Sequence, residues 1–264
     1  MNLDICAATD TGRGRSNNED SIAVDRETGL AVLADGMGGY NAGEVASDLA
    51  CAVVLQTLGA WLRAAPVDAE PADVAAALSR SVGDANRHIL DVATSDPRCA
   101  GMGTTLVAAV FRPDGFLIGH VGDSRAYLWR AGRLAQITRD HSLLQEQIDA
   151  GLLSPDDALT SSHRNLVTRA IGVEATVETE VHWHALQAGD VVLLCSDGLT
   201  DMLSDTAIAA RLGGPDGVDA IARRLVDAAN EAGGKDNISV ILVRAAPGGA
   251  AESGSGRSWW PFRH

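Results

Sequence analysis

The stretch Ser21–Gly39 reads SIAVDRETGLAVLADGMGG and contains two short apolar segments separated by a polar link. Ser21–Val24 and Leu30–Ala34 have the length and the content of Val, Ile and Leu that are typical of buried strands. Asp25–Gly29 joins them, and so short a connection favours an antiparallel hairpin. An Asp-Gly dipeptide directly follows the second segment. The stretch therefore predicts antiparallel sheet structure with a carboxylate at the end of a strand.

Segments of the same character, short apolar runs bounded by Gly, Asp or Pro, recur along the chain. The further predicted strands are Leu3–Ala8, Thr105–Phe111, Phe116–Val121, Ala126–Trp129, Val177–His184, Val191–Ser196 and Ile238–Arg244. Helices are predicted over Gly43–Leu62, Pro71–Val92, Ser142–Ala150 and Asp216–Glu231. Strands and helices do not alternate strictly, which disfavours a doubly wound parallel sheet. We therefore expect an α+β fold in which helices pack outside antiparallel sheets.

The composition of the chain bounds the kinds of partner it can have. Its 264 residues are 46% hydrophobic, enough for a packed core, and 21 Lys and Arg against 35 Asp and Glu give a net charge of -14. Binding nucleic acid or anionic lipid requires a basic surface, so both classes are disfavoured. The same balance is compatible with an enzyme whose acidic residues are partly neutralised by bound metal cations.

Signals for export or membrane insertion are absent from the sequence. It has no run of about 18 apolar residues and no basic start followed by an apolar stretch. Its four cysteines are widely spaced and form no CxxC motif, which indicates reduced thiols. We expect a cytoplasmic protein without membrane insertion.

The chain divides into one large domain and a short tail. Residues 1–245 carry all the predicted strands and helices. Residues 246–264 are rich in Gly and Ser and predict a flexible linker that ends in Trp259, Trp260 and Phe262. That aromatic cluster is either a docking peptide or a disordered end, and we favour the disordered end. Leu152–Arg164 is polar, lacks apolar periodicity and predicts a mobile surface segment.

Four short acidic motifs occur where a predicted strand meets a loop. They are RSNNED at 15–20, DGMGG at 35–39, CSDG at 195–198 and KDN at 235–237. Taken singly, each is more often a turn or a solvated charge than a ligand, because Asp-Gly is the commonest turn dipeptide. Carboxylates that converge from separate strand ends repel one another unless hard cations bind between them, and oxygen ligands suit magnesium or manganese. Four such motifs beside apolar strands therefore favour a metal site.

With their order and spacing, these motifs resemble the protein phosphatase 2C family of metal-dependent serine/threonine phosphatases, in its bacterial branch. The resemblance extends from about Leu3 to Arg244, and it also includes GTT at 103–105, GDSR at 122–125, DHS at 140–142, TRAIG at 168–172 and KDNIS at 235–239. It implies a four-layer αββα sandwich of two antiparallel β-sheets flanked by helices. A binuclear metal centre is then expected at one end of the sandwich.

The resemblance assigns the metal ligands residue by residue. Asp35 would bridge two Mn²⁺ or Mg²⁺ ions, and the backbone carbonyl of Gly36 would bind one of them. Asp197 and Asp236 would complete the other site. Asp123 would help to hold a third, weaker ion. The alternative for Asp123 is a plain hairpin turn, in which its carboxylate bonds its own backbone. The nearby Arg125 of the GDSR motif could also pair with Asp123 and would then mask it.

Other residues of the motifs are expected to support the ions and the substrate. Glu19 and Asp20 would accept hydrogen bonds from waters on the ions, and Asn237 would orient Asp236 or its neighbours. Arg15 would bind the substrate phosphate, because a guanidinium offers paired donors to two oxygens.

The implied activity is hydrolysis of phosphoserine and phosphothreonine in phosphoproteins by a metal-activated water, without a Cys, Ser or His nucleophile. The expected partners are phosphorylated proteins, including a serine/threonine kinase or its targets, and we expect a monomer that binds no nucleic acid. One alternative is a pseudophosphatase that kept the fold as a binding module, which the intact acidic set disfavours. Another is a small-molecule phosphoesterase, which would need a stacking pocket from only ten aromatic residues.

The histidines are weak candidates for the proton donor to the leaving group. Met37 stands where many eukaryotic members of the family have a histidine. His141 could instead serve to pack or cap the helix that follows it. His182 and His184 form an HxH pair on one strand face, but no third ligand lies nearby in the sequence, so we interpret them as ordinary strand residues.

Overall fold

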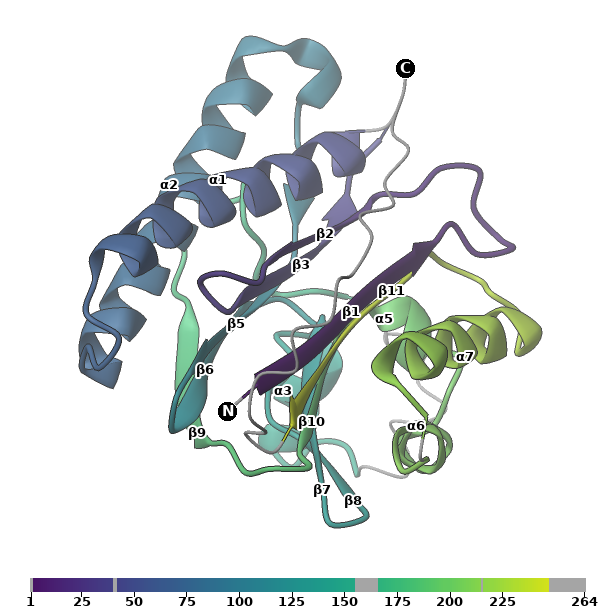
Figure 1. Ribbon diagram of the computed structural model, residues 1–264. Helices are drawn as coiled ribbons and strands as arrows, with labels where there is room; N and C mark the ends of the chain where they lie inside the picture. Colours follow the sequence, from purple (N-terminus) through teal and green to yellow (C-terminus); the bar gives the residue numbers. More distant parts are fainter. Residues whose placement is uncertain (1, 40–41, 155–165, 215, 247–264) are drawn as a thin grey trace, which may run out of the picture.

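The computed structural model describes residues 2–39, 42–154, 166–214 and 216–246. The predicted mobile segment lies within these bounds only at Leu152–Ser154, and the tail from residue 247 onward lies outside them. Figure 1 shows two β-sheets facing each other between two groups of helices.

The first sheet brings the two ends of the domain together, with strands in the order β1-β11-β10-β7-β8. Its strands are β1 (Asn2–Asp10), β11 (Ile238–Ala246), β10 (Val191–Cys195), β7 (Arg125–Arg130) and β8 (Arg133–Gln136). β1 pairs with β11 antiparallel over its whole length, and Asp10 lies opposite Ile238. The loop that follows Asp10 therefore starts beside the residues that precede Ile238.

The second sheet has the order β2-β3-β5-β6-β9, and the short β4 pairs with the end of β3. Its strands are β2 (Asp20–Asp25), β3 (Leu30–Met37), β4 (Gly103–Thr104), β5 (Leu106–Arg112), β6 (Gly115–Val121) and β9 (Glu180–Ala185). The predicted hairpin is confirmed, because β2 pairs with β3 antiparallel from Asp25 opposite Leu30 to Asp20 opposite Asp35.

Helices cover the outer face of each sheet, as Figure 1 shows. The second sheet is covered by α1 (Ala42–Ala64) and α2 (Pro71–Ser95), and the first by α5 (Asp197–Thr200), α6 (Asp205–Leu212) and α7 (Val218–Glu231). A third apolar cluster, which includes Leu33, Phe116 and Ile241, fills the space between the sheets. The predicted four-layer αββα sandwich is confirmed, and each layer is held by burial of its apolar face.

The helix predicted over Ser142–Ala150 is present as α3 (Leu143–Asp149). Ser142 is its N-cap, because the Ser142 hydroxyl accepts a hydrogen bond from the backbone N–H of Gln145. The helical turn η1 (Pro97–Cys99) and the short strands β4 and β8 were not predicted.

Two strand boundaries differ from the prediction by three residues, and the other boundaries of the predicted strands differ by two at most. β3 continues past Ala34 to Met37, because β4 supplies hydrogen-bonding partners opposite Gly36 and Met37. The carboxylate of Asp35 therefore belongs to the strand rather than to a turn after it. β9 begins at Glu180, three residues after the predicted start at Val177, because its pairing with β6 begins with His120 opposite Glu180.

By length and composition, α1 is the one helix in the described part of the chain that could cross a membrane, with a mean hydropathy of 1.5. Ala46, Ala50, Val54 and Leu58 of α1 are fully buried in the cluster formed with α2 and the second sheet. The apolar character of α1 is thus that of a core helix of the sandwich.

Candidate metal centre

Both sheets contribute carboxylates to one end of the sandwich. Asp35 lies near the end of β3, and Asp20, the first residue of β2, lies directly opposite it. Asp197 begins α5 two residues after the last residue of β10, and Asp236 lies two residues before the start of β11. Asp123 lies in the turn between β6 and β7. The structure thus brings together acidic residues from all four motifs and from the GDSR turn.

The charges in this cluster act strongly on one another. Burial and then the neighbouring Asp20, Asp197, Asp123 and Asp236 raise the pKa of Asp35 well above its ordinary value. Burial also raises the pKa of Asp197 well above its ordinary value, and Asp123 adds to the effect. Without a cation, the cluster therefore keeps protons up to a higher pH than isolated carboxyls do.

Two carboxylate oxygens of the cluster are buried without a hydrogen-bond partner in the described part of the chain. Oδ1 of Asp20 and Oδ1 of Asp197 are buried and accept no hydrogen bond from the described residues. Buried carboxylate oxygens normally have such partners, and an unpaired one costs free energy. Oxygen-only donors of this kind match the preference of Mg²⁺ and Mn²⁺, so the residues present fit a hard divalent cation.

Asp35 is held in place through its backbone. Its N–H donates to the hydroxyl of Thr105 (3.1 Å), and its carbonyl accepts from the N–H of Thr105 (2.9 Å). The hydroxyls of Thr105 and Ser124 lie 2.7 Å apart. This chain of contacts links Asp35 on β3 to the turn that carries Asp123, so the two carboxylates share one rigid support.

Gly36 allows α1 to approach β3 at the same place. Its N–H donates to the carbonyl of Glu19 (3.0 Å). A Cβ atom at Gly36 would lie 2.0 Å from the carbonyl oxygen of Gly43 in α1. Any side chain here would therefore separate the helix from the strand next to Asp35.

Asn237 secures the loop that carries the RSNNED motif. Its Oδ1 accepts from the N–H of Glu19 (2.8 Å), and its Nδ2 donates to the carbonyls of Thr11 and Asn17 (both 2.9 Å). Only its backbone N–H bonds Asp236, at Oδ1 (2.9 Å). The side chain of Asn237 therefore positions Glu19, one of the neighbours that the sequence left open, rather than Asp236.

Arg15 reaches from that loop to the cluster. Its Nη2 lies 2.7 Å from Oδ2 of Asp236, and 52% of its side chain is exposed. The hydrogen bond to Asp236 raises the pKa of Arg15 further. Burial raises the pKa of Glu19, although Arg15 opposes this. The guanidinium is thus both anchored at the cluster and open to solvent.

Asp123 is 8% exposed, and burial followed by the nearby Asp140 raises its pKa to about 6. Arg125 forms its ion pair with Asp140 and not with Asp123, a pairing that the sequence had left open. Nε and Nη2 of Arg125 bond the carboxylate of Asp140 instead, at 2.6 to 3.0 Å. Arg125 is therefore engaged elsewhere, and Asp123 keeps its place in the cluster.

Asp201 is an acidic neighbour that the sequence analysis did not single out. It raises the pKa of both Asp197 and Asp123, and its N–H donates to the carbonyl of Asp197 at 2.8 Å. The spacing of four residues in SDGLTD, which puts Asp197 and Asp201 on one face of a helix, is the signal that could have found it.

Met37, His141, His182 and His184 lie outside the carboxylate cluster. Met37 pairs with Gly103 across β3 and β4. His182 bonds Glu180, and His184 stacks on Phe116 with ring centroids 5.3 Å apart. His141 bonds Gly122 and Glu180 through its two ring nitrogens. Each of these three rings thus has a structural contact.

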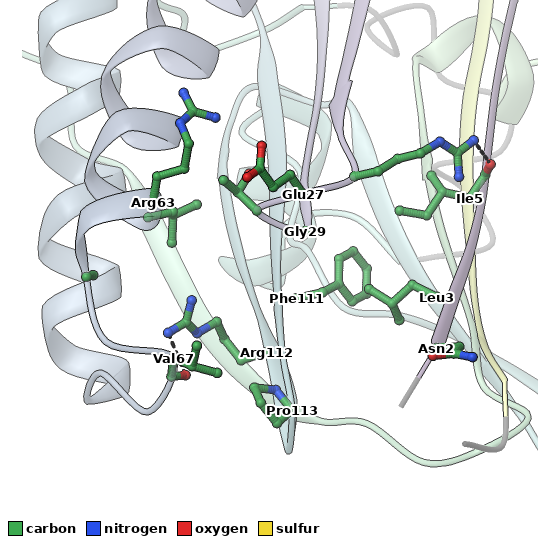
Figure 2. A pocket seen from close by; sticks show the side chains of 14 residues that line it. Asn2, Leu3, Ile5, Glu27, Gly29, Arg63, Val67, Phe111, Arg112 and Pro113 are labelled. Carbon is green, nitrogen blue, oxygen red and sulfur yellow. Dashed lines mark hydrogen bonds between the residues drawn. The ribbon is translucent and has the colours of Figure 1, made fainter. Parts of the chain in front are cut away.

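Figure 2 shows a cavity of about 610 Å³ at the other end of β2 and β3. Arg26, Arg63 and Arg112 line it, together with apolar residues such as Phe111. Their guanidinium groups donate to protein acceptors: Arg26 to the carbonyl of Ile5, Arg63 to Asp25, and Arg112 to the carbonyls of Pro66 and Val67. This cavity is separate from the acidic cluster and contributes nothing to it.

The facing sheets and the carboxylate cluster at one end define a metal-dependent hydrolase of the αββα class. The sequence pattern of the family described as Protein phosphatase 2C matches residues 11–242. The chain therefore belongs to the protein phosphatase 2C family.

Individual relatives agree with this assignment. The serine/threonine phosphatase stp of Listeria welshimeri is 39% identical over 240 residues, which are 89% of this chain and 93% of that protein. The structure of the Mycobacterium tuberculosis serine/threonine phosphatase PstP/Ppp superimposes with a TM-score of 0.83 at 38% identity, covering 93% of this chain and 99% of the other. The catalytic domain of PstP in complex with two manganese ions matches with a TM-score of 0.81, 38% identity and the same coverage.

Proposed function

We propose that this protein is a serine/threonine phosphatase that hydrolyses phosphoserine and phosphothreonine in phosphoproteins at a binuclear Mn²⁺ or Mg²⁺ centre. The observation that carries the proposal is the cluster of mutually repelling carboxylates, in which Asp20 and Asp197 each keep a buried oxygen that no described residue bonds. Its relatives are serine/threonine phosphatases, and one of them was crystallised with two manganese ions.

The residues that would hold the ions are those of the cluster. Asp35 is the candidate for the bridging ligand that the family resemblance implies, and its buried place among Asp20, Asp197, Asp123 and Asp236 supports this. The carbonyl of Gly36, Asp197 and Asp236 would complete the pair of sites, and Asp123 would serve a weaker third ion. When bound, the cations supply Lewis acidity that activates water near neutral pH and neutralises charge on the phosphoryl group.

The other residues of the site would bind and orient. Glu19 and Asp20 would accept hydrogen bonds from waters on the ions, and Asn237 fixes the backbone of Glu19. Arg15 would bind two phosphate oxygens through its guanidinium, which is half exposed and tethered beside the cluster by Asp236. Substrate phosphate would thus meet a fixed positive charge among the carboxylates.

A thiol nucleophile does not fit the structure. Cys195 lies near Asp197 in the sequence but is fully buried in β10. Burial raises its pKa to about 12, so the thiol stays protonated at neutral pH. This supports attack by water rather than by cysteine.

Partners, location and domain limits belong to the same proposal. The substrates would be phosphorylated proteins, among them a serine/threonine kinase or its targets, and the net charge of -14 supports a protein that binds no nucleic acid. We place it in the cytoplasm as a monomer. Residues 1–245 would form the phosphatase domain, which the family match over 11–242 supports, and 246–264 a flexible tail.

A comparison of substrates tests this proposal against its two alternatives. With Mn²⁺, the purified full chain is expected to release phosphate from p-nitrophenyl phosphate and from a phosphothreonine peptide, and only slowly from nucleotides. No turnover of any of them would indicate a pseudophosphatase. Preference for nucleotides or other small esters would indicate a small-molecule phosphoesterase.

A further inference from the structure

A cluster of two histidines and a glutamate lies beside the Asp123 turn but is not part of the carboxylate cluster. His120 on β6, His141 and Glu180 on β9 each offer a donor atom within 4.8 Å of the others. His120 is fully buried and His141 nearly so, and their rings stack with centroids 4.7 Å apart and planes at 19°. These side chains come from three segments that are far apart in the sequence.

The hydrogen bonds within the cluster argue against a zinc site. Nδ1 of His141 accepts the N–H of Gly122 at 3.1 Å, so the proton of the neutral ring is on Nε2. Nε2 lies 3.3 Å from Oε2 of Glu180, to which it donates. A metal on Nε2 would have to displace that proton and leave an imidazolate, unless the bond to Gly122 were broken. Both ring nitrogens of His141 are therefore occupied by hydrogen bonds, whereas Nδ1 of His120 is buried and has no partner among the described residues.

His141 holds both polar backbone groups of Gly122. In addition to the bond to Nδ1, the N–H of His141 donates to the carbonyl of Gly122 at 3.0 Å. Gly122 has a φ of +101°, and a Cβ there would lie 2.7 Å from Thr105, so the turn is tightly constrained on its other side as well. Asp123 is the next residue, so the two hydrogen bonds between His141 and the backbone of Gly122 also help to place the Asp123 carboxylate.

We propose that His141 is a positioning residue that fixes the Gly122–Asp123 turn, and that Glu180 holds His141 in the tautomer this requires. The inference rests on the proposed function, in which Asp123 serves a weaker third ion. Glu180 acts on Nε2–H, and the stacked His120, anchored by its Nε2 to the carbonyl of Arg139 at 2.8 Å, fixes the plane of the ring. Groups that orient a ligand in this way typically change metal affinity by 10- to 100-fold when removed.

Two substitutions at His141 separate positioning from packing. His141→Phe keeps an aromatic ring for His120 but removes the acceptor for the Gly122 N–H. His141→Asn gives up the ring but can restore that acceptor, because its Oδ1 is attached at the same atom as Nδ1. In calorimetric titrations with Mn²⁺, His141→Phe is expected to weaken the weakest site by ~10-fold or more and to leave the tighter sites unchanged. His141→Asn is expected to recover most of that affinity, although it loses the stacking that supports stability.

The tautomer is measured separately in the metal-free full chain. Nitrogen-15 NMR of the His141 ring is expected to show an unprotonated Nδ1 and a protonated Nε2 at neutral pH. Glu180→Ala is expected to mix the two tautomers and to weaken the third site. His182→Ala is the matched control, because it removes the other partner of Glu180, at 2.7 Å, without touching His141. His182→Ala is expected to change neither the tautomer of His141 nor the Mn²⁺ affinity of the third site.

The outcomes distinguish this inference from the proposed function. A protein that hydrolyses phosphopeptides but has a protonated Nδ1 on His141, binds no third ion, or binds it equally well as His141→Phe would overturn the inference and leave the activity standing. Equal losses of affinity and melting temperature in the Phe and Asn variants would show that His141 only packs. Absence of phosphatase activity in the parent protein would overturn the proposed function instead.

Discussion

Asp20 and Asp35 lie directly opposite each other on the adjacent antiparallel strands β2 and β3. Like charges in this relationship destabilise a sheet. Hydrogen bonds stabilise the charge of Asp20 only in part. The hydroxyl of Ser196 donates to Oδ2 of Asp20 at 2.8 Å, but Oδ1 has no partner among the described residues. Repulsion between these two carboxylates therefore destabilises the folded protein, and a bound cation would remove that repulsion.

The stability of the metal-free protein is expected to fall as the pH rises. The pKa values of Asp20, Asp35 and Asp197 are raised in the folded protein, and that of Asp123 is raised to about 6. Between about pH 4 and each folded pKa, the folded state holds protons that the unfolded chain has released, so unfolding becomes easier with rising pH. Thermal melting of chelator-treated protein at pH 5 and pH 7.5 measures this, and added Mn²⁺ is expected to reverse the loss. A melting temperature that rises over this interval and does not respond to Mn²⁺ would contradict the account of the cluster.

Activity is expected to survive alkylation of the cysteines. Burial raises the pKa of Cys51 and of Cys195 to about 12, so neither thiol is a nucleophile at neutral pH. Phosphate release after treatment with iodoacetamide is expected to match that of untreated protein at the same Mn²⁺ concentration. Loss of turnover with the metal still bound would point to a thiol mechanism.

Arg15 and Asp236 are in contact at 2.7 Å, but they are expected to act on different ligands. Arg15→Ala is expected to raise KM for a phosphopeptide by roughly 10- to 100-fold, the cost of a lost charged hydrogen bond, with metal affinity near normal. Asp236→Asn is expected to weaken Mn²⁺ binding first. Arg13→Ala is the control, because Arg13 is exposed on the same loop and carries the same charge. Loss of metal by Arg15→Ala together with normal binding by Asp236→Asn would invert these roles.

Gly198 is expected to be required for close packing beside Asp197. A Cβ there would lie 1.9 Å from the carbonyl oxygen of Asn237, so α5 would be pushed away from the start of β11. Gly198→Ala is expected to lower the free energy of unfolding by about 1–3 kcal/mol, the usual cost of overpacking. In Gly83→Ala, on α2, the new Cβ meets nothing within 4 Å, and a gain of up to about 1 kcal/mol is expected. Urea unfolding measures the free energy of unfolding of both variants. Equal changes in Gly198→Ala and Gly83→Ala would refute the packing argument.

Local sequence pattern was enough to predict most of the strands and helices. The hairpin of β2 and β3 follows from two apolar runs and a short link, and the αββα layers follow from the resemblance. β8 escaped prediction because Arg133–Gln136 is a four-residue edge strand with mostly exposed side chains. β4 has two residues and exists only through its pairing with the end of β3. Neither strand leaves a periodic signal in the sequence.

Some features of the site could likewise be predicted from the sequence, and others could not. The acidic motifs could be placed at one end of the sandwich because each adjoins a recognisable strand. The side chain of Asn237 could not, because its partners Thr11, Asn17 and Glu19 lie more than two hundred residues earlier in the chain. The contact between His141 and Glu180 is likewise set by the packing of separate segments, which spacing in the sequence does not encode.

The central claim is that the carboxylates around Asp35 form the metal centre that drives phosphate release. The most direct test follows phosphate release from a phosphothreonine peptide as Mn²⁺ is titrated into the parent protein and into Asp35→Asn. The parent is expected to be inactive in excess chelator and to reach saturation with Mn²⁺, and Asp35→Asn is expected to lose ~100-fold or more. Release that persists in chelator, or an Asp35→Asn variant that matches the parent at saturating Mn²⁺, would contradict the claim.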